Sequence, residues 1–180
     1  MGDKILIGDG RMKKRTRYEP NEIILHENYA EILLYNRQGK VTHSAFIDLE
    51  DVERVNKYTW GRSANQYVEC RELNIYLHRF IMNCPKDMEV DHINHNGLDN
   101  RKENLRIVTH KQNKFNNPIL STNTSGVTGV SWSKQKNKWR AYITIDDKQK
   151  SLGYYFNKED AIKARKEAEE KYFGEFRNKE

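Results

Sequence analysis

Polar residues between positions 89 and 113 have side chains suited to metal-assisted chemistry. Residues 89–100 read Glu-Val-Asp-His-Ile-Asn-His-Asn-Gly-Leu-Asp-Asn, and Asn113 follows a short apolar run. The Asp91 carboxylate and the Asn113 amide oxygen are hard ligands of the kind that a divalent cation such as magnesium prefers. An imidazole ordinarily titrates near neutral pH, so His92 is suited to act as a general base.

Local patterns predict the elements that position these side chains. Residues 90–92 are typical of a strand end, Asn96-Gly97 of a turn, and residues 105–108 of a returning strand. Thr109-His110-Lys111-Gln112 has capping-box spacing, which predicts a helix beginning just after Thr109. A strand, loop, strand and helix in this order would bring Asp91, His92 and Asn113 together.

The segment resembles the HNH endonucleases, specifically the phage and intron-associated branch, over roughly residues 21–117. The resemblance is carried by Val-Asp-His-Ile-Asn-His-Asn-Gly-Leu-Asp-Asn-Arg from Val90, Asn-Leu-Arg-Ile-Val-Thr from Asn104, Gln-Asn at 112–113 and the lead-in Leu-His-Arg-Phe at 77–80. It implies a metal finger of two strands and a helix. Asp91 and Asn113 would bind one divalent ion, His92 would be the general base, and Asn104 would brace the loop and orient the histidine. The third motif position, often histidine, is asparagine here, which leaves the ion open between magnesium and manganese.

In-line attack by water would leave a 5′-phosphate and a 3′-hydroxyl, with Arg79 or Arg106 near the phosphate. We interpret His95 and His110 as surface residues.

The alternative to an enzyme is a DNA-binding regulator with an inactive HNH fold. An RNA-binding protein has little support, because no RNA-recognition motif is visible.

Composition agrees with a nucleic-acid partner. The 180 residues have a net charge of +6, a pI of about 9.2 and a mean hydropathy of -0.99, while 11% aromatic content argues against a disordered chain. The excess charge lies in residues 1–20, with six Lys/Arg against three Asp/Glu, and in residues 121–156, with six against two. The N-terminal stretch is either a frayed tail or a basic arm that touches phosphates.

The sequence predicts a soluble, cytoplasmic protein of a phage or its bacterial host. Cys70 and Cys84 form no CxxC pair, which disfavours a disulfide framework or a cysteine-built zinc site. No apolar stretch approaches the ~18–20 residues of a membrane span, and the N-terminus lacks the apolar region of a signal peptide.

Upstream of the motif we expect strands at 23–25, 30–35 and 41–47, with a hairpin turn at 36–40. A short helix is expected over 49–58, a strand pair at 67–70 and 74–77, and a helix from His78 that stops near Pro85.

Residues 125–175 resemble the APETALA/ethylene-response-factor type of DNA-binding domain. The resemblance is carried by Ser-Gly-Val-Thr-Gly-Val-Ser-Trp from Ser125, Lys-Trp-Arg-Ala-Tyr-Ile from Lys138, Ser-Leu-Gly-Tyr-Tyr from Ser151 and Glu-Asp-Ala from Glu159. It implies a three-stranded sheet on one helix, with the sheet in the DNA major groove. We expect strands at 127–132, 138–145 and 148–155, a turn at 146–147 and a helix over 158–172.

Strand alternation predicts which side chains face DNA. Trp139, Ala141, Ile143 and Ile145 should face the helix. The residues expected at DNA are Ser131, Ser133, Lys134, Lys136, Arg140, Tyr142, Thr144, Lys148, Lys150 and Ser151. The base-reading residues of the plant family are mostly absent from these positions, so its target sequence does not carry over.

Together these patterns predict an α+β protein of two domains. The domains are a basic tail (1–20), an HNH nuclease domain with extra strands (21–117), a linker (118–125) and a small three-stranded sheet packed on one helix (126–176). We expect a monomeric endonuclease of phage or homing type that cuts double-stranded DNA at a preferred site.

Overall fold

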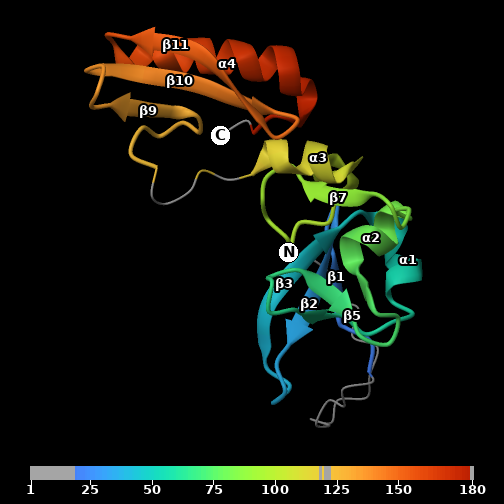
Figure 1. The fold of residues 1–180 in the computed structure, drawn as a ribbon. Coiled ribbons are helices and arrows are strands. Elements are labelled where there is room, and N and C mark those ends of the chain that lie inside the picture. Colours follow the sequence, from blue (N-terminus) through green and yellow to red (C-terminus); the bar gives the residue numbers. More distant parts are fainter. Residues whose placement is uncertain (1–18, 118, 120–122, 179–180) are drawn as a thin grey trace. The chain divides into compact units, whose positions relative to one another are not determined.

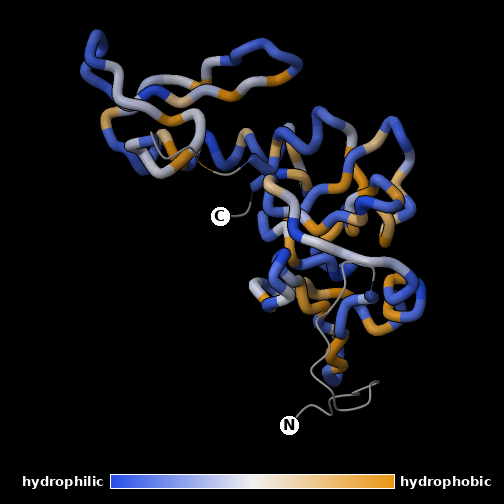
Figure 2. Tube along the Cα trace, turned by 90° about the horizontal axis from the view of Figure 1, so that it is seen from below, coloured by the Kyte–Doolittle hydropathy of each residue, from blue (hydrophilic) through white to orange (hydrophobic). Residues whose placement is uncertain are grey.

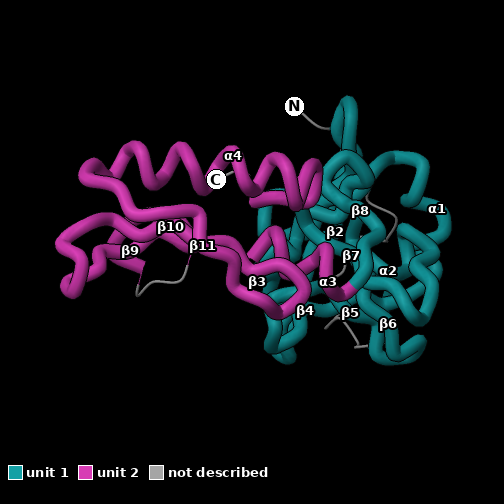
Figure 3. The backbone as a smooth tube through the Cα atoms, turned by 45° about the horizontal axis from the view of Figure 1, so that its top comes forward, with its two compact units in different colours: residues 1–109 teal, residues 110–180 magenta. Residues whose placement is uncertain are grey.

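This computed structural model describes residues 19–117, 119 and 123–178. The chain divides into two compact units, residues 1–109 and 110–180 (Figure 3). Both units combine helices with small antiparallel sheets, as expected for the α+β class that the sequence predicted. The expected basic tail, up to residue 18, and positions 118 and 120–122 of the expected linker lie outside the described residues, so the predicted domain boundaries stay predictions.

The first sheet of unit 1 consists of β1 (Ile23–Leu25), β2 (Ala30–Tyr35) and β3 (Val41–Ile47), in that order. These bounds match the predicted strands. In the β2–β3 turn, the Asn36 Oδ1 atom accepts hydrogen bonds from the backbone N–H groups of Gln38 and Lys40, and Gly39 has a φ of 77°. A positive φ suits glycine, so the predicted hairpin is confirmed with its turn chemistry.

The apolar core of unit 1 packs against β2 and β3. Buried and half-buried residues alternate along β2, as a strand with one covered face requires. Ile32, Leu34 and Ile47 are fully buried, together with Val55 and Trp60. Each such large side chain contributes about 1.5–3 kcal/mol on leaving water, so this cluster anchors the elements that follow.

Short elements connect the first sheet to the motif. They are η1 (Leu49–Asp51), α1 (Val52–Val55), β4 (Gly61–Arg62), β5 (Val68–Cys70), β6 (Ile75–Tyr76) and α2 (Leu77–Met82). Strands β4, β5 and β6 form a second antiparallel sheet. Helix α2 ends at Asn83, which adopts the left-handed conformation with a φ of 47°, so the helix stops before Pro85 as predicted.

The motif itself forms a two-stranded sheet of β7 (Glu89–His92) and β8 (Leu105–Val108), with η2 (Lys102–Asn104) before the second strand. The register pairs Asp91 with Arg106 and His92 with Leu105. The loop between the strands docks on the first sheet, because the Phe46 N–H donates to the Leu98 carbonyl and the Asn100 N–H donates to the Phe46 carbonyl, each at 2.8 Å.

Unit 2 begins with α3 (His110–Asn113) and η3 (Lys114–Asn116). It continues with β9 (Val130–Ser133), β10 (Lys138–Ile145), β11 (Lys148–Tyr155), α4 (Lys158–Phe173) and η4 (Gly174–Phe176). The strands form one antiparallel sheet along which α4 lies (Figure 1). Asp146 and Asp147, with φ values of 51° and 58°, make the two-residue turn between β10 and β11 that the sequence predicted.

Apolar and polar residues alternate along much of β10, and Figure 2 shows hydrophobic and hydrophilic stretches side by side in unit 2. Ala141 and Ile143 are fully buried, and the small residues Ala161 and Ala168 let α4 approach the sheet closely. Arg165 was not predicted to face the sheet, yet it is 5% exposed and donates to the Tyr142 carbonyl at 2.6 Å.

No helix in the described part of the chain has the length and apolar character that crossing a membrane requires.

Candidate active site

Asp91 and His92 are the last two residues of β7, and both are buried. Arg106, opposite Asp91 on β8, donates from Nε and Nη2 to the Asp91 Oδ2 atom at 2.8 and 2.7 Å. The guanidinium and the carboxylate therefore form a charge-assisted pair with two hydrogen bonds to one oxygen. Arg106, expected near the phosphate, is thus paired with the predicted metal ligand, and its contact with a phosphate stays a prediction.

His92 is held in one orientation by Asn100. Its Nε2 atom lies 3.4 Å from the Asn100 Oδ1 atom, and Asn100 is fully buried. An amide oxygen only accepts hydrogen bonds, so this contact requires the proton on Nε2. A neutral ring with its proton there carries its lone pair on Nδ1, the atom that can accept a proton from water.

The electrostatic surroundings keep His92 neutral. Burial lowers the pKa of His92 below its usual value, and this effect outweighs the hydrogen bond to Asn100 and the charges of Asp91 and Asp99, which act in the opposite direction. An imidazole with a lowered pKa is unprotonated at pH 7, as a general base must be.

Aromatic rings surround His92 on the side of α2 and β5. The Tyr67 ring stacks on it with centroids 5.5 Å apart, and the His78 ring meets it edge-on at 5.0 Å. Tyr76 in turn stacks on His78 at 5.4 Å. We call Tyr67, Tyr76, His78 and His92 the ring cluster.

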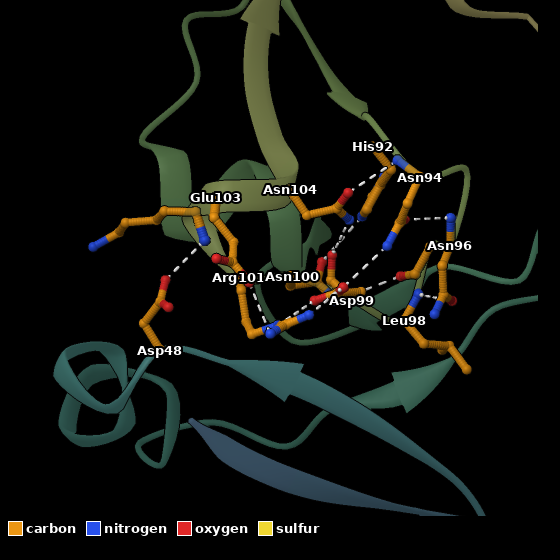
Figure 4. A network of polar contacts seen from close by, with 12 residues as sticks. Asp48, His92, Asn94, Asn96, Leu98, Asp99, Asn100, Arg101, Glu103 and Asn104 are labelled. Carbon is orange, nitrogen blue, oxygen red and sulfur yellow. Dashed lines mark hydrogen bonds and ion pairs between the residues drawn. The ribbon is translucent and has the colours of Figure 1, made fainter. Parts of the chain in front are cut away.

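Asn104 braces the loop between β7 and β8 (Figure 4). Its Nδ2 atom donates to the Asp99 carbonyl at 2.8 Å, and its Oδ1 atom accepts the Asn94 N–H at 2.9 Å. The side chain thus ties the two ends of the loop together, in line with the bracing role that the sequence predicted. The amide beside the His92 ring, however, belongs to Asn100 rather than to Asn104.

A second anchor fixes the same loop through Asp99. Arg101 donates from Nε and Nη2 to the two carboxylate oxygens of Asp99, both at 2.8 Å, and the Asn94 Nδ2 atom donates to Oδ2 at 3.1 Å. Burial opposes ionisation of Asp99, but the Arg101 hydrogen bonds prevail and lower the pKa of this carboxyl. The loop that carries Asn100 is therefore rigidly held.

The predicted site residues come from both units. Asp91, His92 and Asn104 lie in the β7–β8 hairpin of unit 1, and Asn113 is the last residue of α3 in unit 2, so the predicted metal pair of Asp91 and Asn113 stays a prediction. Arg79 donates to the carbonyls of Met88 and Pro85, each at 2.7 Å, and its expected position near the phosphate stays a prediction.

The strand register of the unit 2 sheet shows on which face of the sheet each residue predicted to contact DNA lies. Arg140 pairs with Ser131 and Tyr154, while Tyr142 pairs with Ser151. Paired residues share a face, and Ala141 on the other face is buried against α4. We call the side away from α4 the outer face; Ser131, Ser133, Arg140, Tyr142, Thr144 and Ser151 belong to it.

Lys148 and Lys150 lie on the opposite side of the sheet from that face. They pair with Ile145 and Ile143, which pack toward α4, and the Lys150 Nζ atom donates to the Tyr172 hydroxyl of α4 at 2.7 Å. Their expected position near the phosphates stays a prediction, and the register places both on the α4 side of the sheet.

Cations and aromatic rings are paired along the outer face. The Lys136 Nζ atom lies 4.2 Å from the Tyr154 ring centroid, the Lys138 Nζ atom 4.1 Å from that of Phe156, and the Arg140 Cζ atom 4.8 Å from that of Tyr142. Such contacts hold cationic groups in place at a surface.

The segment that contains the motif matches a known protein family. A family model described as HNH endonuclease matches residues 76–115. An uncharacterized HNH endonuclease of Acanthamoeba polyphaga mimivirus is 31% identical over 173 residues, which cover 92% of this chain and 89% of the relative. The chain belongs to the HNH endonuclease family. Protein 3.8 of Escherichia phage T7 is 42% identical over 65 residues, which cover 36% of this chain and 54% of that protein. No solved structure matches.

The matched HNH segment contains the hairpin and most of the side chains that surround His92. His78, Asn100 and Arg106 lie in it, whereas Tyr67 lies outside. Sequence reasoning missed His78, Asn100 and Tyr67 as neighbours of His92. Asn100 had a detectable signal, because it stands in the quoted Asp-Asn-Arg run of the HNH motif, but Tyr67 had none.

HNH nucleases generally use a divalent metal ion, and the donor set at Asp91 fits a hard cation. Within the described residues no three His, Cys, Asp or Glu side chains converge to hold a metal. An ion at Asp91 would thus take one carboxylate and complete its shell with amide and water oxygens, as magnesium does. Because Arg106 already donates to Oδ2, an ion would share that carboxylate with the guanidinium.

Gly97 of the HNH loop is required by its neighbours. A Cβ atom there would lie 2.6 Å from the Tyr67 Cδ1 atom and 3.0 Å from the Gln66 carbonyl. We expect Gly97→Ala to displace the ring that stacks on His92 and to lower the DNA cleavage rate by up to about 100-fold. Gly61→Ala is the matched control, since nothing lies within 4 Å of its added Cβ. Equal cleavage rates for the two variants would contradict this role of Gly97.

Proposed function

We propose that the protein is a metal-dependent endonuclease that hydrolyses phosphodiester bonds of double-stranded DNA at a preferred site, in the manner of phage or homing enzymes. The observation that carries the proposal is the neutral, buried His92, with its Nε2 atom on Asn100, beside the ion-paired Asp91 at the end of β7. Both residues lie in the segment that matches the HNH endonuclease model, and the relatives are viral.

In this proposal each residue has a distinct part in the reaction. Water attacks the phosphorus in line while the Nδ1 atom of His92 accepts its proton. Asp91 and Asn113 would hold one divalent ion, magnesium or manganese, which stabilises the growing charge on the phosphate and the leaving oxygen. Asn100 keeps the base in the required tautomer, and Asn104 holds the loop. The products carry a 5′-phosphate and a 3′-hydroxyl.

We further propose that unit 2 grips duplex DNA through its outer face, as in APETALA-type domains. The proposal is supported by the three-stranded antiparallel sheet of unit 2, which packs on one helix. The outer face presents Arg140 and Lys138, each held by an aromatic ring. A strand ribbon fits the major groove, and cations at its surface neutralise phosphates.

Paired substitutions in unit 2 test this grip. Arg140→Ala removes a charge from the outer face, and we expect it to raise the DNA dissociation constant by about tenfold and to reduce its salt dependence by about one unit of slope. Lys150→Ala removes the same charge from the α4 side of the sheet and should have a much smaller effect. Titrations of labelled duplex DNA at several salt concentrations would measure both. Equal losses in the two variants would contradict the outer-face assignment.

The endonuclease activity itself is tested with supercoiled DNA that carries the sequence surrounding the protein's own gene. The protein is incubated with this DNA in magnesium, in manganese and in a chelator. We expect nicked or linear product with either metal and none in the chelator, and DNA ligase should reseal nicks that carry a 5′-phosphate. DNA binding without cutting in either metal would favour the DNA-binding regulator instead.

A further inference from the structure

His78 is a buried polar residue that the proposed mechanism does not use. It is the second residue of α2 and is 6% exposed. Its helix neighbours Leu77 and Ile81, one turn apart, belong to the apolar core of unit 1, whereas His78 packs among the ring cluster. The helix thus divides its buried side chains between core and site.

The rings of the cluster form two crossed pairs. Tyr67 lies nearly parallel to His92, at 23°, and Tyr76 nearly parallel to His78, at 16°. His78 stands at 87° to His92 and at 71° to Tyr67. In this arrangement His92 has a ring stacked on it and a second ring at right angles, which leaves it little freedom to rotate.

The Nδ1 atom of His78 is buried and has no hydrogen-bond partner among the described residues. This nitrogen therefore ties His78 to no described element, and what the side chain gives its neighbours is the plane and volume of its ring. Burial, with smaller contributions from His92 and Arg79, lowers the pKa of His78 to about 3. The ring is uncharged at neutral pH and does not repel a proton arriving on His92.

We propose that His78 is a positioning residue that fixes the His92 ring, through their edge-on contact, with its Nε2 atom toward Asn100. The inference rests on the proposed function, because it assigns His78 a part in the same reaction. Asn100 contacts one edge of the His92 imidazole, and Tyr67 covers one of its faces. The His78 ring meets the imidazole edge-on and restricts its rotation. The ring need not exchange a proton or bind an ion to do this.

Two substitutions at His78 separate the ring from its nitrogens. His78→Ala removes the ring, and we expect the single-turnover cleavage rate of the full chain to fall about 10- to 100-fold, as for other misplaced catalytic groups. The DNA dissociation constant in chelator should stay within about twofold of the parent's, because His78 is only 6% exposed and offers little surface to a ligand. His78→Phe restores an aromatic plane and should cleave within about threefold of the parent.

A spectroscopic measurement without DNA completes the test. In histidine labelled with ¹⁵N, we expect His92 to carry its proton on Nε2 in the parent and in His78→Phe, and to show a mixture of tautomers in His78→Ala. Ile81→Ala is the control for lost packing in α2, since it empties a core position yet should leave both the tautomer and the cleavage rate unchanged.

The outcomes are distinguishable. Parent-like cleavage and a single tautomer in His78→Ala would overturn the positioning role, and so would a His78→Phe variant as slow as His78→Ala. If the parent itself cuts no DNA, the proposed function fails, and the tautomer spectra alone then decide whether His78 positions His92.

Discussion

Asp91→Ala is expected to destabilise unit 1 and to abolish metal-dependent cleavage. The Asp91 carboxylate is buried and accepts two hydrogen bonds from Arg106, whose side chain is only 15% exposed. Removing one partner of such a pair leaves a poorly solvated charge and costs about 3–5 kcal/mol. The same substitution removes the carboxylate that we propose as a metal ligand. Urea unfolding and the supercoiled-DNA assay would measure the two losses.

A double variant separates stability from chemistry at this pair. Asp91→Ala combined with Arg106→Ala removes both charges, so we expect it to recover much of the stability that Asp91→Ala loses, while cleavage stays absent. Arg106→Ala alone retains the carboxylate and should still cut DNA. Cleavage by the double variant would show that Asp91 is not a ligand in the reaction.

Asn104→Ala is expected to loosen the whole motif loop. Its side chain satisfies the Asn94 N–H and the Asp99 carbonyl, and Asn104 is 6% exposed. An unsatisfied buried polar group costs about 1–3 kcal/mol, so we expect a loss of roughly 2–4 kcal/mol from two such groups. Because the loop carries Asn100, the cleavage rate should fall even at temperatures where the fold is intact.

Asn96→Ala is the matched control for Asn104→Ala. Asn96 belongs to the same loop and accepts one hydrogen bond, from the Leu98 N–H at 3.1 Å, but it is exposed to solvent. Water can replace that bond, so we expect a loss below about 1 kcal/mol. Thermal unfolding that ranks the two variants equally would contradict the bracing role of Asn104.

The elements that local patterns specify were predicted closely. The bounds of β1, β2, β3, β10 and β11 match the expected strands, because apolar alternation and turn residues act over only a few positions. Asp91 and His92, which we propose as the catalytic pair, were likewise predicted from adjacent residues at the end of a strand. These features depend on neighbours in sequence rather than on contacts across the fold.

The surroundings of His92 depend on distant contacts and could not be predicted. Asn100 and Asn104 are both amides of one motif, and which of them faces the imidazole is set by the path of the loop. That path is fixed by Phe46 of β3 and by the Asp99–Arg101 pair. Tyr67 lies far upstream, and only the fold shows that Gly97 leaves room for its ring.

The packing of the chain just after Thr109 depends on contacts that a local pattern does not show. The expected helix after Thr109 begins where predicted, but it is short, and Phe115 just beyond it stacks on Phe173 at 4.0 Å. That contact places Phe115 against the apolar core of unit 2. An apolar residue after a capping box does not reveal which core it will join.

The central claim is that His92 is the base of a DNA-cutting reaction, and the most direct measurement compares the parent with His92→Ala on supercoiled DNA in magnesium. We expect the parent to produce nicked or linear DNA and the variant to be slower by about 100- to 10,000-fold, the usual contribution of a general base. DNA affinity should be unchanged, since the ring is buried. Cleavage by His92→Ala at the parent's rate would contradict the account.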